Sequence, residues 1–186
     1  MTKVVVPPAI EPITASVAKL HTRVDSDIED SLIETWIRSG RIVAEGFQNR
    51  AYIEQTLEMT LDRFPQSPFE LAMPPLVSVE SIKYFDQENI EHTIDPNDYY
   101  VDNASEPGRV SLNYSKSWPA VNLRPINGVV IRYKAGYGQS VEDVPKNVQD
   151  ALLVYVTYRY YVREAEGDNP PQQFYWLLGP DRMVPV

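Results

Sequence analysis

Hydrophobic residues recur every three or four positions between residues 27 and 47, the spacing that places side chains on one face of an α-helix. The apolar residues with this spacing are Ile28, Leu32, Ile33, Trp36, Ile37, Val43, Ala44 and Phe47. We expect a helix over residues 27–47, with its start marked by a capping box of Ser26 and Glu29. The face expected to pack inside the subunit consists of Ile28, Leu32, Trp36 and Ile37.

The chain before this helix contains an extended segment and one shorter helix. Three prolines within residues 1–12 disfavour helical backbone there, so this segment is predicted to be an extended arm. Thr14 is a suitable N-cap for a short helix over residues 15–21.

From Ala51 the hydrophobic period changes to two, which predicts a half-buried strand. Its apolar positions are Ile53, Leu57, Met59 and Leu61. Further strands are predicted at residues 77–85, 93–94, 99–102, 109–112 and 129–134, separated by the turn sequences FPQSP, DQEN, DPND, EPGR and PING. Short strands at this spacing predict a small antiparallel sandwich or barrel.

The helical period returns over residues 145–165, with Pro145 suited to the first helical position. The predicted inward side chains are Val148, Ala151, Leu152, Tyr155, Tyr158 and Val162. A single helical hairpin cannot bury its apolar face alone. The predicted fold is therefore α+β, with helices from both chain ends packed together and an antiparallel β-rich insertion in the middle. The expected domains are 1–48 plus 143–186, helical with an N-terminal arm and a C-terminal tail, and 49–142, the β insertion.

The charge balance limits the kinds of partner that the chain is expected to bind. Seventeen basic and 26 acidic residues give a formal net charge of −9, which disfavours sequence-specific nucleic-acid binding but suits a surface past which DNA slides. The chain has no cysteine, and this excludes disulfides, thiol nucleophiles and cysteine zinc sites. We expect no signal peptide, because only three valines precede Pro7 and Pro8, and no membrane span, because no apolar run approaches roughly 18 residues.

Five carboxylates between residues 25 and 34 raise the question of a metal site or acid–base chemistry. They are Asp25, Asp27, Glu29, Asp30 and Glu34. Acidic residues are favoured in the first turn of a helix, and these residues spread around the helix rather than converge on one point. We therefore interpret them as a helix start and a solvated face, and we expect no metal or other cofactor.

Other candidate sites also have structural explanations. His21 and His92 lie in different predicted elements, without a second metal ligand at helical spacing. Residues 95–106 place Asp95, Asn97 and Glu106 at calcium-loop positions, but Tyr100 occupies the position that requires glycine. A turn leading into a strand fits this segment better.

Aromatic residues gather toward the C-terminus, and two interpretations of them remain open. Tyrosines 155, 158, 160 and 161 fall on several sides of the last long helix, where they either contact a neighbouring molecule or pack on the β insertion. The apolar segment FYWLL, residues 174–178, either docks on another chain or folds back on its own subunit.

Several sequence blocks, taken in order, resemble one known family, the head–tail connector (adaptor) proteins of long-tailed double-stranded DNA phages and gene-transfer agents. The block from PITASVAKLHTRV to TLDRFP is similar to the family's opening two helices and first strand. PPLVSVESIKYFD, DYYVD, PGRVSLNYSKSWP and VVIRYKAGYG resemble its middle strands, and VPKNVQDALLVYVTYRYYVREA with LLGPDRM resembles its closing helix and tail. Together these blocks cover residues 12–183.

The resemblance implies a non-enzymatic structural role in the virion, with assembly in the host cytoplasm. About twelve copies would form a ring under the portal protein, extend the DNA channel without reading its sequence, and join the capsid to a tail or stopper protein. The expected interface residues are Tyr158, Tyr161, Phe174, Tyr175, Trp176, Leu177, Leu178, Arg182 and Met183. The residues expected to face neighbours or the channel are Glu29, Asp30, Glu34 and Arg41.

Two alternatives from other functional classes follow from the composition. The β insertion is also compatible with a binding or adhesion module, in which Tyr99, Tyr100, Tyr114 and Trp118 form a stacking platform for a carbohydrate or a tail-fibre partner. An enzyme would have to rely on paired carboxylates, because cysteine and paired histidines are missing.

Overall fold

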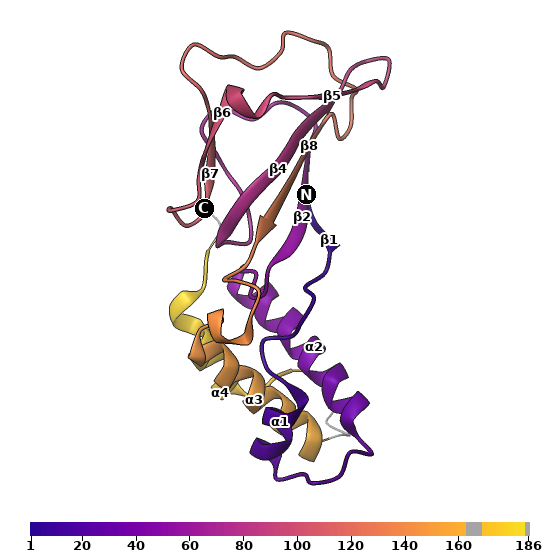
Figure 1. Ribbon diagram of the computed structural model, residues 1–186, viewed down its shortest axis with the longest axis vertical. Coiled ribbons are helices and arrows are strands. Elements are labelled where there is room, and N and C mark those ends of the chain that lie inside the picture. The colour runs from indigo at the N-terminus through magenta and orange to yellow at the C-terminus, as the bar shows by residue number, and fades with distance from the viewer. Residues whose placement is uncertain (163–168, 185–186) are drawn as a thin grey trace. The chain divides into compact units, whose positions relative to one another are not determined.

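The computed structural model describes residues 1–162 and 169–184, which divide into two compact units. The first, here called the β unit, contains Met1–Pro8 and Glu54–Tyr137. The second, here called the helical unit, contains Ala9–Ile53 and the described residues from Gly138 onward. Figure 1 shows all strands in the β unit and all α-helices in the helical unit, so the predicted α+β class is confirmed.

The β unit contains two antiparallel sheets. The five-stranded sheet has the order β1 (Thr2–Val6), β2 (Gln55–Leu61), β8 (Val129–Ala135), β4 (Leu76–Phe85) and β5 (Glu91–Thr93). The three-stranded sheet has the order β3 (Phe69–Glu70), β7 (Arg109–Leu112) and β6 (Tyr99–Asp102), with the short 3₁₀ helix η1 (Pro96–Asp98) before β6. The predicted bounds of β6 and β7 are confirmed residue for residue.

The period-two pattern of β2 and β8 places apolar side chains on one face of the five-stranded sheet. Leu57 is paired with Tyr133 and Met59 with Ile131, and Leu57, Tyr133 and Ile131 are fully buried. Glu58 is paired with Arg132 on the opposite face. This alternation is the reason why one face forms the core while the other carries charge.

The N-terminal segment belongs to the β unit, whereas the sequence analysis placed it in the helical domain. Residues 2–6 form β1, which pairs with β2 through Thr2 opposite Met59 and Val4 opposite Leu57. The unit boundaries fall at 8/9, 53/54 and 137/138, whereas the sequence placed them at 48/49 and 142/143. The segment is extended, as predicted, but it is an edge strand of its own chain and not a free arm.

The helical unit is built around α3 (Lys146–Tyr161), which contacts α1 (Ala15–Thr22), α2 (Asp30–Gln48) and α4 (Gln172–Leu178). Two 3₁₀ turns, η2 (Val141–Asp143) and η3 (Gly179–Asp181), lie near the ends of these helices. Thr14 caps α1 as predicted, because its Oγ1 accepts a hydrogen bond from the Val17 amide at 3.3 Å. Pro145 is the N-cap of α3, and residues 163–165 of the predicted helix lie outside the described residues.

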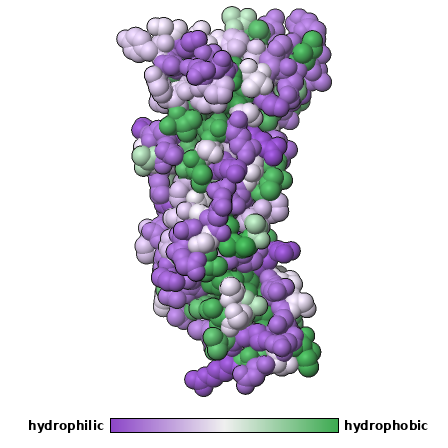
Figure 2. All heavy atoms as spheres, in the orientation of Figure 1, coloured by the Kyte–Doolittle hydropathy of each residue, from purple (hydrophilic) through white to green (hydrophobic). Residues whose placement is uncertain are grey.

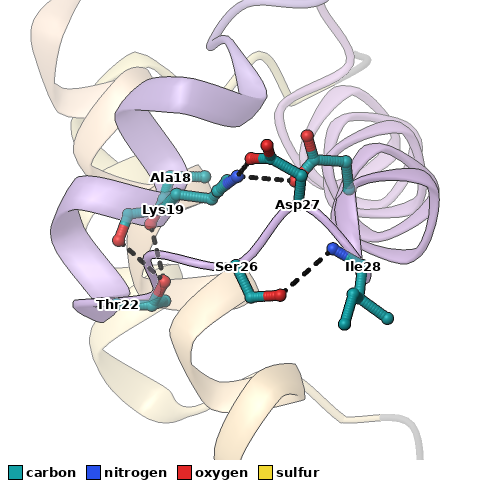
Figure 3. Close-up of polar contacts among 7 residues, drawn as sticks. Ala18, Lys19, Thr22, Ser26, Asp27 and Ile28 are labelled. Carbon is teal, nitrogen blue, oxygen red and sulfur yellow. Dashed lines mark hydrogen bonds and ion pairs between the residues drawn. The ribbon is translucent and has the colours of Figure 1, made fainter.

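The start of α2 differs from its prediction. The helix begins at Asp30, Glu29 is its N-cap without a side-chain cap, and Ser26 Oγ instead accepts from the Ile28 amide at 3.3 Å (Figure 3). The predicted capping box is therefore wrong, because the chain bends at residues 24–29 before the helix begins. Ile28 is 90% exposed and so does not belong to the inward face.

The inward face of α2 is formed by a neighbouring set of residues, since Ile33, Trp36, Ile37 and Ala44 are buried and Leu32 is not. Close packing against α3 fixes this choice. A Cβ at Gly40 would lie 2.7 Å from a ring carbon of Tyr155, so a glycine is needed where the two helices approach.

Candidate interaction surfaces

The C-terminal segment of the chain forms part of the core of the helical unit. Phe174 and Leu178 of α4 are both 0% exposed, and the ring of Phe174 lies 5.7 Å from that of Tyr155. The side chain of Gln48 donates to the Leu178 carbonyl at 2.6 Å, and that of Arg50 donates to the Asp181 carbonyl at 2.6 Å. The fold-back alternative is therefore correct, and the prediction that Phe174 and Leu178 meet another chain is wrong.

Most of the other tail residues predicted at an interface are also held by their own chain. Arg182 lies over the ring of Phe47, with 4.7 Å from its Cζ to the ring centre, and its Nε donates to the Phe47 carbonyl at 3.0 Å. The rings of Tyr175 and Phe47 are 4.9 Å apart. The amide of Met183 donates to the Gln48 carbonyl at 2.9 Å. These contacts fix the tail against the end of α2.

Besides Arg182, which is exposed although it contacts Phe47, two residues of the predicted interface remain broadly exposed. They are Trp176 on α4, which is 67% exposed, and Tyr161 at the end of α3, whose hydroxyl donates to the Thr22 carbonyl at 3.0 Å. Tyr158 and Leu177 are half-buried. The exposed side of α4 and η3, here called the α4 face, consists of Gln172, Gln173, Trp176, Gly179 and Pro180. None of these residues is charged.

Asp27 and Asp30, near the start of α2, face Lys19 of α1. Lys19 is bonded to Asp27 (Figure 3), and its Nζ also lies 2.8 Å from the Asp30 carboxylate. The hydrogen bond from Lys19 holds the pKa of Asp27 below its ordinary value, and the bonds to Asp27 and Asp30 raise the pKa of Lys19. Within the described residues no cluster of histidines and carboxylates is arranged to hold a metal ion.

Glu29 and Glu34, which were predicted to face neighbours or the channel, differ in exposure. Glu29 is half-exposed and precedes α2 directly, while Glu34 is exposed. Glu34 and Arg38 border a shallow groove whose apolar wall includes Ile13 and Ile37. The exposure of Glu34 is compatible with its predicted position toward a neighbour or a channel.

Arg41, predicted to be free for contacts with neighbours, is instead buried inside the helical unit. Its Nε lies 2.6 Å from Glu11 and its Nη1 lies 2.8 Å from Glu45, whose other oxygen accepts from the Tyr52 amide at 3.0 Å. Burial raises the pKa of Glu45. Burial also disfavours the charged form of Arg41, but the bonds to Glu11 and Glu45 outweigh this and raise its pKa. The network ties residues 11 and 52 to the middle of α2.

The solvent-facing side of the five-stranded sheet carries charges that are paired with each other. Ion pairs join Lys3 to Glu58 at 2.8 Å, Lys134 to Glu54 at 2.9 Å, Lys83 to Glu91 at 2.7 Å and Arg132 to Glu80 at 2.9 Å. Because each of these cations faces a carboxylate, the surface is balanced rather than basic. These four cations are therefore not free to bind a phosphate backbone without breaking an ion pair.

The aromatic platform predicted in the β unit does not form. The ring of Trp118 stacks on Phe64 at 5.0 Å, and its Nε1 donates to the Pro65 carbonyl at 2.7 Å. Tyr99 is buried, whereas Tyr100 and Tyr114 are exposed. Since two of the four predicted side chains are occupied within the unit, the binding-module hypothesis loses its proposed surface.

The histidines and the calcium-like segment have local structural partners. His21 Nδ1 lies 2.8 Å from the Thr157 hydroxyl, and His92 Nε2 lies 2.8 Å from Asp86. The hydrogen bond from His92 lowers the pKa of Asp86. Asp95 accepts from the Asn97 amide at 2.9 Å and so caps η1, which confirms the predicted turn.

One surface was missed by the sequence analysis, and it lies on the solvent side of α2. At about 100° per residue, seven consecutive positions of the helical wheel form a continuous arc without a charge. This arc, here called the α2 outer face, consists of Ser31, Leu32, Thr35, Ser39, Ile42, Val43 and Gly46, all of which are exposed or half-exposed. Ile42 is 58% exposed. The sequence signal was present, but Leu32 and Val43 were assigned to the inward face and Ile42 was not considered.

No α-helix within residues 1–162 and 169–184 is both long and apolar enough to cross a bilayer. Figure 2, coloured by hydropathy, shows hydrophobic and hydrophilic residues interspersed over the visible face, with hydrophobic groups reaching the surface in several places. Scattered apolar side chains are common on protein surfaces, whereas a continuous uncharged surface such as the α2 outer face is a candidate contact site.

Comparison with known proteins identifies the fold but no family. No family model matches the chain, and no curated protein matches it. Among solved structures, a chain from the neck of an empty gene transfer agent (GTA) particle, computed with C6 symmetry, matches with a TM-score of 0.82 and 18% identity. A chain from the virion of a native GTA particle gives 0.82 and 17%, and one from a native GTA neck computed with C12 symmetry gives 0.76 and 18%. Each match covers 100% of this chain and 97% of the other, so the chain has, over its whole length, the fold of a GTA neck protein.

Proposed function

We propose that this chain is a structural, non-enzymatic component of the head–tail junction of a phage-like particle. In this proposal about twelve copies form a ring beneath the portal, extend the DNA channel, and join the capsid to a tail or stopper protein. The observation that carries the proposal is the match of both units to GTA neck chains, with a TM-score of 0.82 and 97% of the other chain covered. The C6 and C12 symmetry with which those necks were computed supports the proposed ring.

Matching both units matters more than matching either one. Small helical bundles and small β-sandwiches each occur in many unrelated proteins, so neither unit alone would point to a function. A chain that alternates between the units as this one does, with residues 1–8 and 54–137 in one and the remainder in the other, is a far more specific arrangement. That arrangement is what the GTA neck chains share.

The charge distribution supports a conduit for DNA. A net charge of −9 repels phosphate, so DNA can move past the ring without being held. The cations on the five-stranded sheet are paired with carboxylates, as described above, and so they do not form a DNA-binding surface. Glu34, exposed on α2, is one acid that can contribute to a channel wall or face a neighbour.

Electron microscopy of the purified protein, alone and with its portal protein, tests the proposal. We expect closed rings of about twelve copies, alone or stacked on the portal, as in the necks with C12 symmetry. Antibody labelling of whole particles should mark the junction between head and tail. A chain that forms no ring in either sample, and that is absent from purified particles, would refute the proposal.

A further inference from the structure

In a ring with rotational symmetry, each copy meets its two neighbours through two different surfaces. The question that follows is which surfaces of this chain meet. The inference in this section rests on the proposed function, because it assumes a ring. It goes further by naming the two surfaces within the helical unit that form the contact between copies.

The α2 outer face is the first of these surfaces. Its main residues follow a three–four spacing, Leu32, Thr35, Ser39, Ile42 and Gly46, and thus form a straight stripe along the helix. Residues at this spacing line the face by which one helix packs against a neighbouring helix. Within the described chain, most of this side of α2 is exposed to solvent while the other side packs on α3; Ser39 lies at the margin, with its hydroxyl 3.2 Å from that of Tyr155.

A helix face that remains in water ordinarily carries charged residues, because they cost nothing there and keep the protein soluble. On α2 the charged residues lie elsewhere: Glu34 and Arg38 border the groove at one margin, and Arg41 and Glu45 are buried. The arc between these margins is neutral and contains Ile42, which is largely exposed. Such a face is typical of a surface covered in an assembly.

The charge of the chain favours a second copy of itself as the covering partner. Every copy carries a net charge of −9, so copies repel each other wherever their acids are brought together. Contact between identical acidic molecules is least opposed where both surfaces are neutral. A strongly basic partner, by contrast, would be selected by carboxylates, and the α2 outer face has none.

The α4 face is the second neutral surface of the helical unit. It carries Trp176, and tryptophan is the residue type most enriched among those that dominate binding energy at interfaces. Both α2 and α4 pack on α3, and α4 also contacts α2 near its C-terminal end, so the two faces are distinct surfaces of the helical unit. Two distinct surfaces on one copy are what a head-to-tail ring requires.

We propose that the α2 outer face of one copy docks on the α4 face of the next copy, with Trp176 packed against the stripe around Ile42. Phe174 and Leu178 anchor α4 from inside, so Trp176 is presented on a fixed helix. The buried side of α4 therefore serves folding, and its exposed side serves assembly.

Cross-linking tests this contact directly, because the natural chain has no cysteine. The double variant Thr35→Cys with Gln173→Cys, treated with a short bismaleimide under ring-forming conditions, should give a ladder of covalent oligomers up to the full ring. Either single variant should give no ladder. Rings that yield no ladder from the double variant, or abundant dimers from Thr35→Cys alone, would overturn the contact, since dimers would mean that α2 faces α2.

A charge placed on the stripe provides the second measurement. Ile42→Glu should weaken self-association by roughly a hundredfold, because a carboxylate would be buried in an apolar contact. The matched control is Leu20→Glu, an equally drastic change at an exposed position of α1, which should assemble as the natural chain does. If Ile42→Glu forms normal rings, the inference fails and the proposed function stands. If the natural chain forms no rings with or without portal, the proposed function fails with it.

Discussion

Replacing Phe174 by alanine should destabilise the helical unit severely, whereas replacing Trp176, two residues away, should not. The ring of Phe174 is fully buried and lies 5.7 Å from Tyr155 and 5.3 Å from Tyr175. Removing a buried phenylalanine ring costs about 3–5 kcal/mol of unfolding free energy, through lost burial and the cavity left behind. Against a domain stability of about 5–15 kcal/mol, this is a large fraction.

The same substitution at Trp176 removes a ring that is 67% exposed. Little apolar surface returns to water in that case, so the expected loss is about 1 kcal/mol or less. The two variants thus differ by several kilocalories per mole although both remove an aromatic ring from the same short helix. Their assembly should differ in the opposite sense, because Trp176→Ala is expected to fold normally and to assemble poorly.

Urea denaturation followed by tryptophan fluorescence and circular dichroism measures this contrast. Fluorescence reports on both units, since Trp36, next to Tyr160, and Trp176 lie in the helical unit and Trp118 lies in the β unit, whereas far-ultraviolet circular dichroism follows mainly the helices. Because the chain has two units, the two probes need not give one shared transition. A loss below about 1 kcal/mol for Phe174→Ala, equal to that for Trp176→Ala, would refute the assignment of α4 to the core.

Two further predictions concern single sites. Gly40→Ala should destabilise the helical unit by about 1–3 kcal/mol, because its Cβ would lie 2.7 Å from the Tyr155 ring, whereas Gly46→Ala, with no atom within 4 Å, should stabilise it by up to about 1 kcal/mol through helix propensity. Thermal melts of both variants check this, and equal effects at the two glycines would contradict the packing argument. In the β unit, hydrogen bonds from Arg109 and then Ser105 lower the pKa of Asp102 to about 2. Since the unfolded value is about 3.9, the stabilisation from this group is complete above about pH 4 and is lost as the pH falls toward 2. A carboxyl NMR titration should show this pKa, and Arg109→Gln should move it upward; an unchanged value in the variant would contradict the assigned cause.

Local sequence signals predicted much of the secondary structure correctly. Strands β6 and β7 have their predicted bounds, and Thr14 caps α1 as expected. In each case the deciding interactions lie within a few residues, as alternating side chains, turn sequences or a cap. Such signals can be recognised without knowing what the segment packs against.

The errors arose where distant parts of the chain meet. Nothing near residues 2–6 indicates that they pair with residues 55–61, about fifty positions later. The burial of Phe174 likewise depends on Tyr155 and on the end of α2 at Gln48, which are far from it in sequence. Arg41 was placed on the surface by its residue type, but Glu11, 30 residues earlier, and Glu45 on the same helix hold it inside.

The missed surface on α2 has a more general cause. A helix that packs on its own chain and on a second copy carries apolar residues on both sides, and the same burial of apolar surface drives both contacts. Hydrophobic periodicity therefore indicates which residues become buried, but not whether their own chain or a second molecule buries them. On α2 the choice is made by α3: where Gly40 lets Tyr155 approach, that side becomes the core, and Ile42 is left on the other. Once α3 has taken one side, the apolar residues that remain exposed are those that the proposed contact between copies would cover.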